Sequence, residues 1–350
     1  MNGKALAYPL ALLTASCLAA CSTPEPPKRA MVPQYMPTAY YNGMGDGAPQ
    51  RAYPVQAMQP NYQYASYNPA AMAQTTPMSP EPAVVMPPTA PLAPPPPAVS
   101  SPSNVGTNAP AIHARSYILI NARNGAVIAA RNADLVCGVA STQKILTALI
   151  VAEAGNLDER VRVAASDVAV EPSKLGVKPG EVYTRRELLI AFLVKSSNDV
   201  ANVLARDNAG STEAFAAKMT AKARSLGASS SSFRNAHGLT ASGQYSTARD
   251  MARIAMAAHR NSVLRDAVRR KYHTFRYASG RTITLENTNE LLGRMPECDG
   301  MKTGYTNPAG RCLISSAHTW NKDVLLVQLG TKTKFIWDDG ARLMRWGLSR

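Results

Sequence analysis

A serine and a lysine stand three positions apart in this chain, as Ser141 and Lys144. The apolar-rich segment 140–152 predicts a long helix with Ser141 at its first turn. Residues three apart share a helix face, so we expect the hydroxyl and the amine to lie side by side. Burial or a second cation nearby keeps such an amine neutral and makes it a base for the hydroxyl. The pair therefore indicates nucleophilic catalysis, and the alternative is an N-cap serine with a surface lysine.

Two more polar motifs follow along the chain. Ser196 and Asn198 form Ser-x-Asn just beyond a predicted helix, and Lys302 begins a Lys-Thr-Gly run ahead of a turn. A second lysine attracts an anionic substrate, and its charge favours the neutral form of the first lysine. Each motif is common by itself. Their order, and their predicted placement on helix, loop and strand, make the combination informative.

The sequence predicts both strands and helices around these motifs. Segment 117–130 reads as a β-hairpin, since Asn124 and Gly125 form a tight turn between two apolar runs. A capping box at 184–187 opens a helix over 187–194. Strand patterns cover 311–317 and 323–331, so the motifs are expected to lie in a mixed fold of the α+β class.

The three motifs in this order resemble those of the penicillin-binding-protein and serine β-lactamase superfamily. Residues 111–350 resemble one branch, the low-molecular-weight D-alanyl-D-alanine carboxypeptidases of peptidase family S11. The resemblance includes the runs 233–239 and 243–251 and a closing helix over 339–347. It implies a β-lactamase/transpeptidase-like (DD-peptidase) fold, with a five-stranded antiparallel sheet flanked by helices and a helical subdomain. We expect its last three strands near 300–331.

The resemblance also implies a role for each polar group on the helix side. Ser141 would be acylated by the penultimate D-Ala of a peptidoglycan stem pentapeptide. Lys144 would take the serine proton and later activate water, Ser196 would relay a proton to the leaving D-Ala, and Asn198 would hold Lys144 and the substrate in register. β-Lactams would act as covalent inhibitors of the same serine.

On the strand side, Lys302 and Thr303 would bind the terminal carboxylate of the substrate. Gly304 would let the strand backbone approach the substrate, because it has no side chain. The oxyanion hole would consist of the backbone N–H groups of Ser141 and Tyr305, donors that are in place before the reaction.

Three alternatives stay open. A D,D-endopeptidase uses the same motifs and differs in how its groove accepts a cross-linked strand. A class A β-lactamase uses a glutamate after the Ser-x-Asn motif to activate the deacylating water. The nearest such residue here, Glu213, is not part of a Glu-x-x-x-Asn pattern, so we expect slow turnover of penicillin. A non-catalytic wall-binding lipoprotein would keep the pocket without the reaction.

Composition divides the chain into two parts. Most of its 26 prolines lie between Ser22 and Pro110, whereas almost all of its net charge of +15 comes from 111–350. A proline-rich segment with little charge cannot bury enough apolar surface to fold. Segment 21–110 is therefore predicted to be a disordered tether, and 111–350 to be the catalytic domain. No Cys/His cluster has the spacing of a zinc site, so we expect neither a metal nor a cofactor.

Residues 1–20 have the layout of an export signal, with one cation and then an apolar run that ends in small residues. The tetrad at 18–21 resembles the lipobox of bacterial lipoproteins, which implies a lipid on Cys21; ordinary cleavage to a secreted protein is the alternative. Ser22 favours the outer membrane by analogy. We expect a protein of the cell envelope or periplasm, held to a membrane only by this lipid, which replaces the C-terminal anchor of some relatives. Export excludes nucleic acid as the partner of the basic charge.

Five other residues and one basic run have no expected catalytic role. Cys298, Cys312 and Cys137 are predicted to be free buried thiols, because a hairpin centred on 307–308 would put Cys312 opposite Thr303 and leave Cys298 out of register. His237 is expected to order a loop through a hydrogen bond. Asp199 is expected to serve a helix start, and the basic run 269–271 to be a solvated face.

Overall fold

The computed structural model describes residues 108–350. The predicted signal 1–20, Cys21 and nearly all of the predicted tether 21–110 lie outside the described residues. Within 108–350, no helix has the length and apolar character needed to cross a membrane. The same residues contain no group of three or more His, Cys, Asp or Glu side chains that could hold a metal ion.

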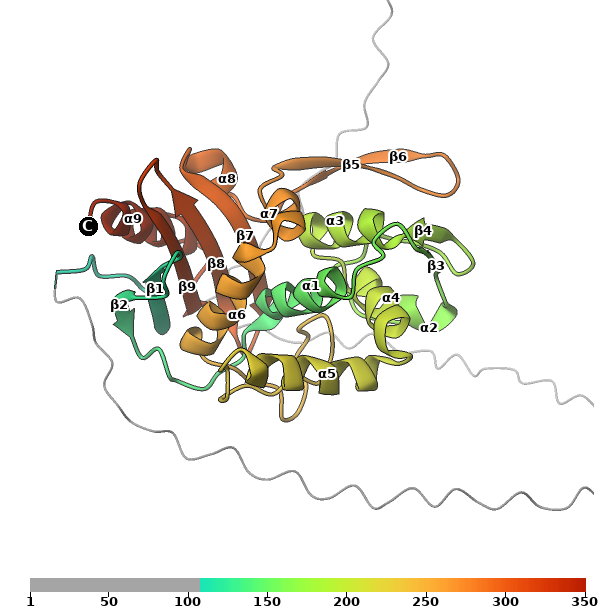
Figure 1. Ribbon diagram of the computed structural model, residues 1–350, viewed down its shortest axis with the longest axis horizontal. Coiled ribbons are helices and arrows are strands. Elements are labelled where there is room, and N and C mark those ends of the chain that lie inside the picture. Colours follow the sequence, from blue (N-terminus) through green and yellow to red (C-terminus); the bar gives the residue numbers. More distant parts are fainter. Residues whose placement is uncertain (1–107) are drawn as a thin grey trace, which may run out of the picture. The chain divides into compact units, whose positions relative to one another are not determined.

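A five-stranded antiparallel sheet forms the centre of the fold (Figure 1), in the order β2-β1-β9-β8-β7. Its strands are β1 Ser116–Asn121, β2 Val127–Arg131, β7 Cys298–Thr306, β8 Gly310–His318 and β9 Asp323–Thr331. The predicted first hairpin, the predicted last three strands and the α+β class are confirmed. The motif strand β7 lies at an edge of this sheet, so one side of its backbone faces the cleft described below.

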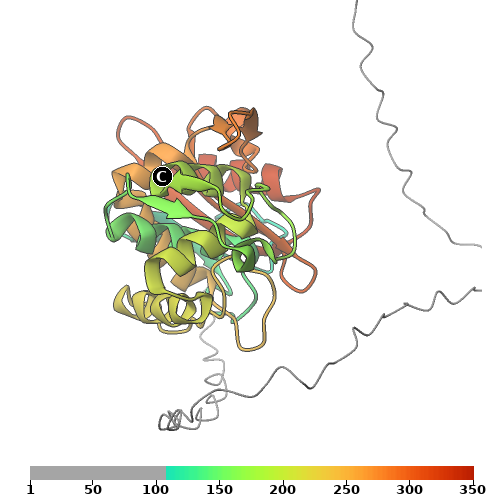
Figure 2. The ribbon, with the colours of Figure 1, turned by 90° about the vertical axis from the view of Figure 1, so that its right-hand side faces the viewer.

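Helices cover both faces of the sheet. They are α1 Lys144–Glu153, α2 Ala165–Val168, α3 Arg185–Lys195, α4 Asn198–Ala209, α5 Thr212–Ser225, α6 Ala248–Arg260, α7 Ser262–Val268, α8 Leu291–Arg294 and α9 Ile336–Leu348. One face packs on α8 and α9, and the other on α6, α7 and the short 3-10 turn Ala140–Gln143. Figure 2 shows α3, α4 and α5 in front of the sheet, as the helical subdomain.

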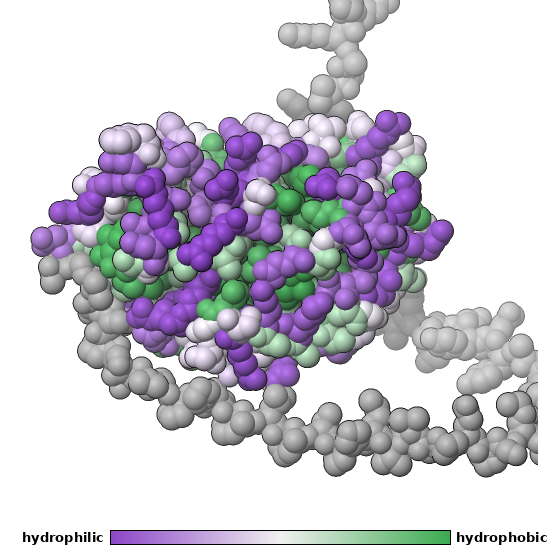
Figure 3. All heavy atoms as spheres, in the orientation of Figure 1, coloured by the Kyte–Doolittle hydropathy of each residue, from purple (hydrophilic) through white to green (hydrophobic). Residues whose placement is uncertain are grey.

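Two small hairpins complete the fold. They are β3 Arg160–Arg162 with β4 Val182–Thr184, and β5 Tyr272–Arg276 with β6 Thr282–Glu286. Neither was predicted from the sequence. The predicted capping box is present, since the Thr184 side chain accepts from the Glu187 N–H while the Glu187 carboxylate accepts from the Thr184 N–H. Hydrophilic residues cover most of the face in Figure 3, with apolar areas between them.

The predicted register of the β7–β8 hairpin is wrong by one residue. Gly304, and not Thr303, lies opposite Cys312, because the strands end at the Thr306–Gly310 pair and leave a three-residue loop. Gly310 has a φ of +72°, the left-handed conformation that suits glycine at such a turn. The expectation of three free buried thiols is confirmed.

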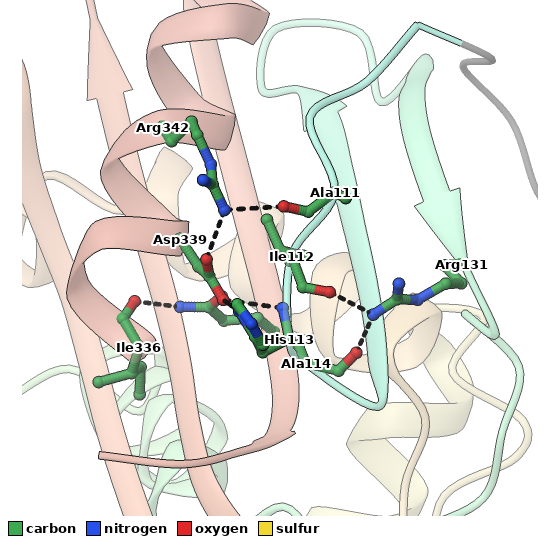
Figure 4. A network of polar contacts seen from close by, with 9 residues as sticks. Ala111, Ile112, His113, Ala114, Arg131, Ile336, Asp339 and Arg342 are labelled. Carbon is green, nitrogen blue, oxygen red and sulfur yellow. Dashed lines mark hydrogen bonds and ion pairs between the residues drawn. The ribbon is translucent and has the colours of Figure 1, made fainter. Parts of the chain in front are cut away.

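The segment before β1 is fastened to the domain by side chains from two elements (Figure 4). The Asp339 carboxylate on α9 accepts from the His113 N–H at 2.8 Å and from the Arg342 guanidinium at 2.6 Å, and Arg342 also donates to the Ala111 carbonyl. Arg131 on β2 donates to two further carbonyls of the same segment. The Asp339 side chain is only 3% exposed, so these partners replace its water.

Asp339→Ala is expected to lower the free energy of unfolding by about 1–3 kcal/mol, because it leaves the His113 N–H and the Arg342 guanidinium without their buried acceptor. Urea denaturation of the two proteins measures this difference. Asp338→Ala is the matched control, since its carboxylate is 87% exposed and lies 4.0 Å from its cation; its cost should stay within about 0.5 kcal/mol. Equal costs for the two variants would contradict the role of Asp339.

Candidate active site

Ser141 lies in the 3-10 turn, and Lys144 is the first residue of α1. The prediction of one continuous helix from residue 140 is therefore wrong at its start. The chain enters the turn through Ala140, whose φ is +48°, and the regular helix begins three residues after the serine. The hydroxyl and the amine still meet as predicted: Lys144 Nζ lies 2.8 Å from Ser141 Oγ.

The Lys144 amine has two other partners. Its Nζ lies 2.7 Å from Asn198 Oδ1 and 2.6 Å from the backbone oxygen of His237. The Ser141 hydroxyl also reaches this carbonyl, at 3.2 Å. These contacts hold the amine and the hydroxyl together without any carboxylate at the amine, which is the arrangement that a lysine base requires.

The environment of Lys144 favours its neutral form. Burial lowers the pKa of Lys144 well below its usual value, the charge of Lys302 lowers it further, and the charge of Asp199 opposes both. Burial also lowers the pKa of Lys302, to about 7. The second cation thus lowers the pKa of Lys144 as predicted, but burial lowers it more.

Lys302→Gln is expected to move the acidic limb of the pH–rate profile to higher pH. Removing the Lys302 charge raises the pKa of Lys144, so a higher pH is needed to keep the base neutral. The measurement is the rate of Ser141 acylation by penicillin as a function of pH. Lys195→Gln removes an exposed lysine of the same cleft and should leave the limb in place. An unmoved limb in Lys302→Gln would show that Lys302 does not tune the base.

Ser196 and Asn198 reach the site from the junction of α3 and α4. Ser196 ends α3 in a left-handed conformation with a φ of +64°, and it lines the same cleft as Ser141. The Asn198 side-chain amide donates to the Glu171 carbonyl at 2.9 Å, and this bond fixes which end of the amide faces Lys144. Asp199 accepts from the Val200 N–H at the start of α4, the structural role expected for it, and from the Leu175 and Gly176 N–H groups of the segment between α2 and β4.

The motif strand β7 borders the site on the other side. Thr303, Gly304 and Tyr305 line a cleft of about 1000 Å³ together with Ser141 and Ser196. Lys302 is different, because its side chain is 1% exposed and its ammonium donates to the Thr303 carbonyl at 2.9 Å.

Gly304 allows β7 to approach the nucleophile turn. A Cβ at this position would lie 2.8 Å from the Ser141 nitrogen and 2.9 Å from the Thr142 nitrogen, closer than real side chains come. The two predicted oxyanion donors, Ser141 and Tyr305, belong to the two backbones that meet here. Their role stays a prediction.

Sequence reasoning missed two groups that the fold brings to the site. The His237 carbonyl binds both Lys144 and Ser141, and a backbone oxygen has no signature in a sequence. Thr288 follows β6, and its hydroxyl lies 2.6 Å from that of Thr303. The His237 ring itself accepts from the Leu239 N–H at 3.2 Å, so the predicted loop-ordering bond is confirmed. Burial, and then the charge of Lys144, lower the pKa of this ring to about 4.

The basic run 269–271, predicted to be a solvated face, contains two arginines in ion pairs and one lysine at the cleft. Arg269 and Arg270 both form ion pairs with Asp266. Lys271 instead lines the cleft, next to β5. Only the last residue of the basic run therefore borders the candidate site.

A serine paired with a buried lysine, an adjacent Ser-x-Asn loop and a Lys-Thr-Gly edge strand on this sheet define a serine peptidase of the penicillin-binding type. The family model described as D-alanyl-D-alanine carboxypeptidase, peptidase S11, matches residues 103–333. The chain belongs to this family.

Curated relatives include both carboxypeptidases and endopeptidases. The chain is 34% identical to D-alanyl-D-alanine carboxypeptidase DacF of Bacillus subtilis over 55% of its own length and 51% of the relative. It is 35% identical to DacB2 of Mycobacterium tuberculosis over 60% and 74%. It is 34% identical to a D-alanyl-D-alanine endopeptidase of Escherichia coli over 61% and 70%. The chain thus spans about half of the first relative and about three quarters of the second.

Solved structures show the same fold. A D-alanyl-D-alanine carboxypeptidase from Mycobacterium tuberculosis matches with a TM-score of 0.67 and 33% identity, over 70% of this chain and 94% of that one. The Streptomyces K15 DD-transpeptidase matches with a TM-score of 0.66 and 29% identity, over 69% and 99%. The predicted β-lactamase/transpeptidase-like fold is confirmed.

Proposed function

We propose that this protein is a serine-type D-Ala-D-Ala carboxypeptidase, which removes the terminal D-Ala from peptidoglycan stem pentapeptides through an acyl-enzyme on Ser141. The observation that carries the proposal is the contact between Ser141 Oγ and the buried Lys144 amine at 2.8 Å. Family membership supplies the substrate class.

In the acylation step, Ser141 Oγ attacks the carbonyl carbon of the penultimate D-Ala, and its proton passes to Lys144 Nζ. The amide bond breaks, and the leaving D-Ala amine receives a proton through the Ser196 hydroxyl. Asn198 keeps the amine in place through its side-chain oxygen, 2.7 Å away. The backbone N–H groups of Ser141 and Tyr305 would stabilise the oxyanion, as preorganised donors do in acyl transfer.

In the deacylation step, Lys144 takes a proton from water, and the resulting hydroxide attacks the acyl carbon. The bond from this carbon to Ser141 Oγ then breaks, and the serine oxygen takes the proton back from Lys144, 2.8 Å away. A class A β-lactamase activates this water with a glutamate that begins a Glu-x-x-x-Asn pattern. No glutamate of this chain begins such a pattern. Glu213 lies on α5, in its first turn, and does not line the cleft. We therefore expect penicillin to leave a slowly hydrolysed adduct on Ser141.

Endopeptidase activity is the second candidate, and the relative in Escherichia coli favours it. The cleft is open and extends past Ser141 to β6, α8 and the start of α9, a length that suits an extended peptide. The two activities share every catalytic step and differ in whether the leaving group carries a free carboxylate.

The place of action is a separate part of the proposal. We propose export by residues 1–20, a lipid on Cys21 as the only membrane attachment, and a tether over 21–110 that lets the domain 111–350 reach the wall. The signal-like and proline-rich composition of these segments supports it. Deleting about half of 22–110 should spare activity on a soluble peptide and reduce action on the wall in cells.

Incubating the purified protein with isolated peptidoglycan, and identifying the products by mass spectrometry, tests the activity. Free D-Ala with shortened stems is the expected result. Cleavage of cross-links alone would establish the endopeptidase. Rapid penicillin hydrolysis would indicate a β-lactamase, and a folded protein that cuts nothing would favour the non-catalytic wall-binding lipoprotein.

A further inference from the structure

The neutral Lys144 amine has two N–H donors and one lone pair, and the site gives it three partners. The Asn198 side-chain oxygen, at 2.7 Å, and the His237 carbonyl, at 2.6 Å, can only accept hydrogen bonds. They take both N–H groups and leave the lone pair for the third partner, the Ser141 hydroxyl at 2.8 Å. The two acceptors therefore orient the lone pair that receives the serine proton.

The His237 carbonyl also competes with the amine for the serine proton. Ser141 Oγ lies 3.2 Å from this carbonyl and 2.8 Å from Lys144 Nζ. A shift of the carbonyl toward the serine would turn the hydroxyl away from its base, and a shift in the other direction would leave an N–H of the amine without its acceptor. The position of one backbone oxygen thus decides whether the serine proton points at the base.

The nucleophile turn and α1 bind three successive carbonyls of the segment that contains His237. The Gln143 side chain, at the end of the turn, donates to the Asn235 carbonyl at 2.6 Å, and the Thr147 hydroxyl on α1 donates to the Ala236 carbonyl at 2.7 Å. The third carbonyl is that of His237, which accepts from the lysine base. The two bonds before it fix where this carbonyl lies.

The segment is also closed on itself. The Asn235 side chain accepts from the Gly238 N–H at 2.7 Å and donates to the Leu239 carbonyl at 3.0 Å. Gln244 donates to the same carbonyl at 2.8 Å. These bonds make 235–239 a tight turn, so a bond to its first carbonyl also restrains its third.

The Gln143 amide is suited to this contact and to little else. Its Nε2 faces three oxygens, the Asn235 carbonyl at 2.6 Å and the side-chain oxygens of Gln244 at 3.3 Å and Asn235 at 3.4 Å. The side chain is fully buried, and no hydrogen bond from residues 108–350 reaches its Oε1. A buried polar atom without a partner is destabilising, and an apolar side chain of the same shape would not have one. Stability alone therefore does not explain a glutamine here.

We propose that Gln143 is a positioning residue, which places the His237 carbonyl so that the lysine base aims its lone pair at Ser141. The inference rests on the proposed function, because it concerns the base of that reaction. Gln143 acts through the 235–239 loop and not on the substrate.

Gln143→Met keeps the length of the side chain and removes its donor. We expect the rate of Ser141 acylation by penicillin to fall about 10- to 100-fold, because the hydroxyl and the base are less well aligned. We also expect the acidic limb of the pH–rate profile to move to lower pH. The His237 carbonyl stabilises the charged amine, so a looser contact lowers the pKa of Lys144 and keeps it neutral in more acidic solution.

The direction of this movement separates positioning from a loss of stability. The other titratable groups that act on Lys144 are Lys302 on β7, Asp199 on α4 and the His237 ring, and the variant keeps all three. The ring is uncharged near neutral pH, since its pKa is about 4. The movement is also opposite to that expected for Lys302→Gln, so the two variants check each other.

Gln328→Met is the matched control. Gln328, on β9, is also fully buried, its Nε2 donates to the Ile336 carbonyl at 2.7 Å, and no hydrogen bond from residues 108–350 reaches its Oε1. It does not line the cleft. The control should change stability by a similar amount, measured by urea denaturation, and keep both the acylation rate and the limb. Thr147→Val removes the neighbouring donor and should move the limb in the same direction as Gln143→Met.

The acylation profile decides the inference, and release of D-Ala from a pentapeptide tests the proposed function separately. A limb that stays in place in Gln143→Met, or that moves equally in Gln328→Met, overturns the inference. If Gln143→Met does not fold, the limb of Thr147→Val decides in its place. A wild type that is acylated but releases no D-Ala contradicts the proposed function alone, and a folded wild type that is not acylated overturns both.

Discussion

Ser141→Ala is expected to abolish release of D-Ala, with a fall in rate of at least ~10³-fold. The substitution removes the oxygen that lies 2.8 Å from Lys144 Nζ and leaves the amine its contacts with Asn198 and the His237 carbonyl. Because Ser141 is a partly exposed residue in a turn, the fold should persist, with a melting temperature close to that of the wild type.

Two measurements check this result. One is D-Ala release from a pentapeptide, and the other is the mass of the protein after exposure to penicillin, which should show no adduct on the variant. Ser225→Ala, which removes an exposed hydroxyl at the end of α5, is the control and should keep both properties. Residual activity near that of the wild type would show that another group is the nucleophile.

Gly238→Ala is expected to have the second large effect. The φ of Gly238 is +90°, and a Cβ there would lie 2.3 Å from the Ala140 oxygen and 2.8 Å from the Ser141 nitrogen. Both are backbone atoms of the nucleophile turn, so the turn or the loop must move. The neighbouring His237 carbonyl, which binds Ser141 and Lys144, would move with it.

We expect kcat to fall about 10²-fold, the cost of displacing catalytic groups by about 1 Å, and stability to fall by about 1–3 kcal/mol. Steady-state kinetics and urea denaturation measure the two effects. Gly243→Ala is the control, since Gly243 also has a positive φ, of +71°, but its Cβ would meet only the flexible end of Arg234. It should lose stability with kcat nearly intact. Equal loss of kcat in both variants would contradict the role assigned to the Gly238 contact.

The residues that sequence reasoning found are those whose side chains carry chemistry at fixed spacing. Ser141 and Lys144 meet as predicted, and Asn198 binds Lys144 as the family pattern implied. The α+β sheet also followed from local patterns, because the Asn124-Gly125 turn and two long apolar runs define its strands. These signals are local or recur in a known order.

The sequence could not show how backbones far apart in the chain pack together. The His237 carbonyl binds Lys144, which lies 93 positions away in the sequence. A side chain at Gly238 would collide with the backbone of Ala140, which is about as far away along the chain, so the neighbours of Gly238 in sequence do not reveal why it is a glycine. Nor does a strand motif reveal that the side chain of Lys302 is buried while its neighbour Thr303 lines the cleft. Which residues of a motif line a cleft depends on tertiary packing, which composition and spacing do not encode.

The fastening of the segment before β1 has a mechanical consequence. Asp339 and Arg342 on α9, with Arg131 on β2, hold residues 111–114 at their places in the domain. A pull on the chain at residue 108 is therefore borne by α9 and by the β1–β2 side of the sheet. The motif strand β7 is the opposite edge, three strands away from β1. Tension at the entry of the domain thus loads the edge of the sheet opposite the motif strand β7.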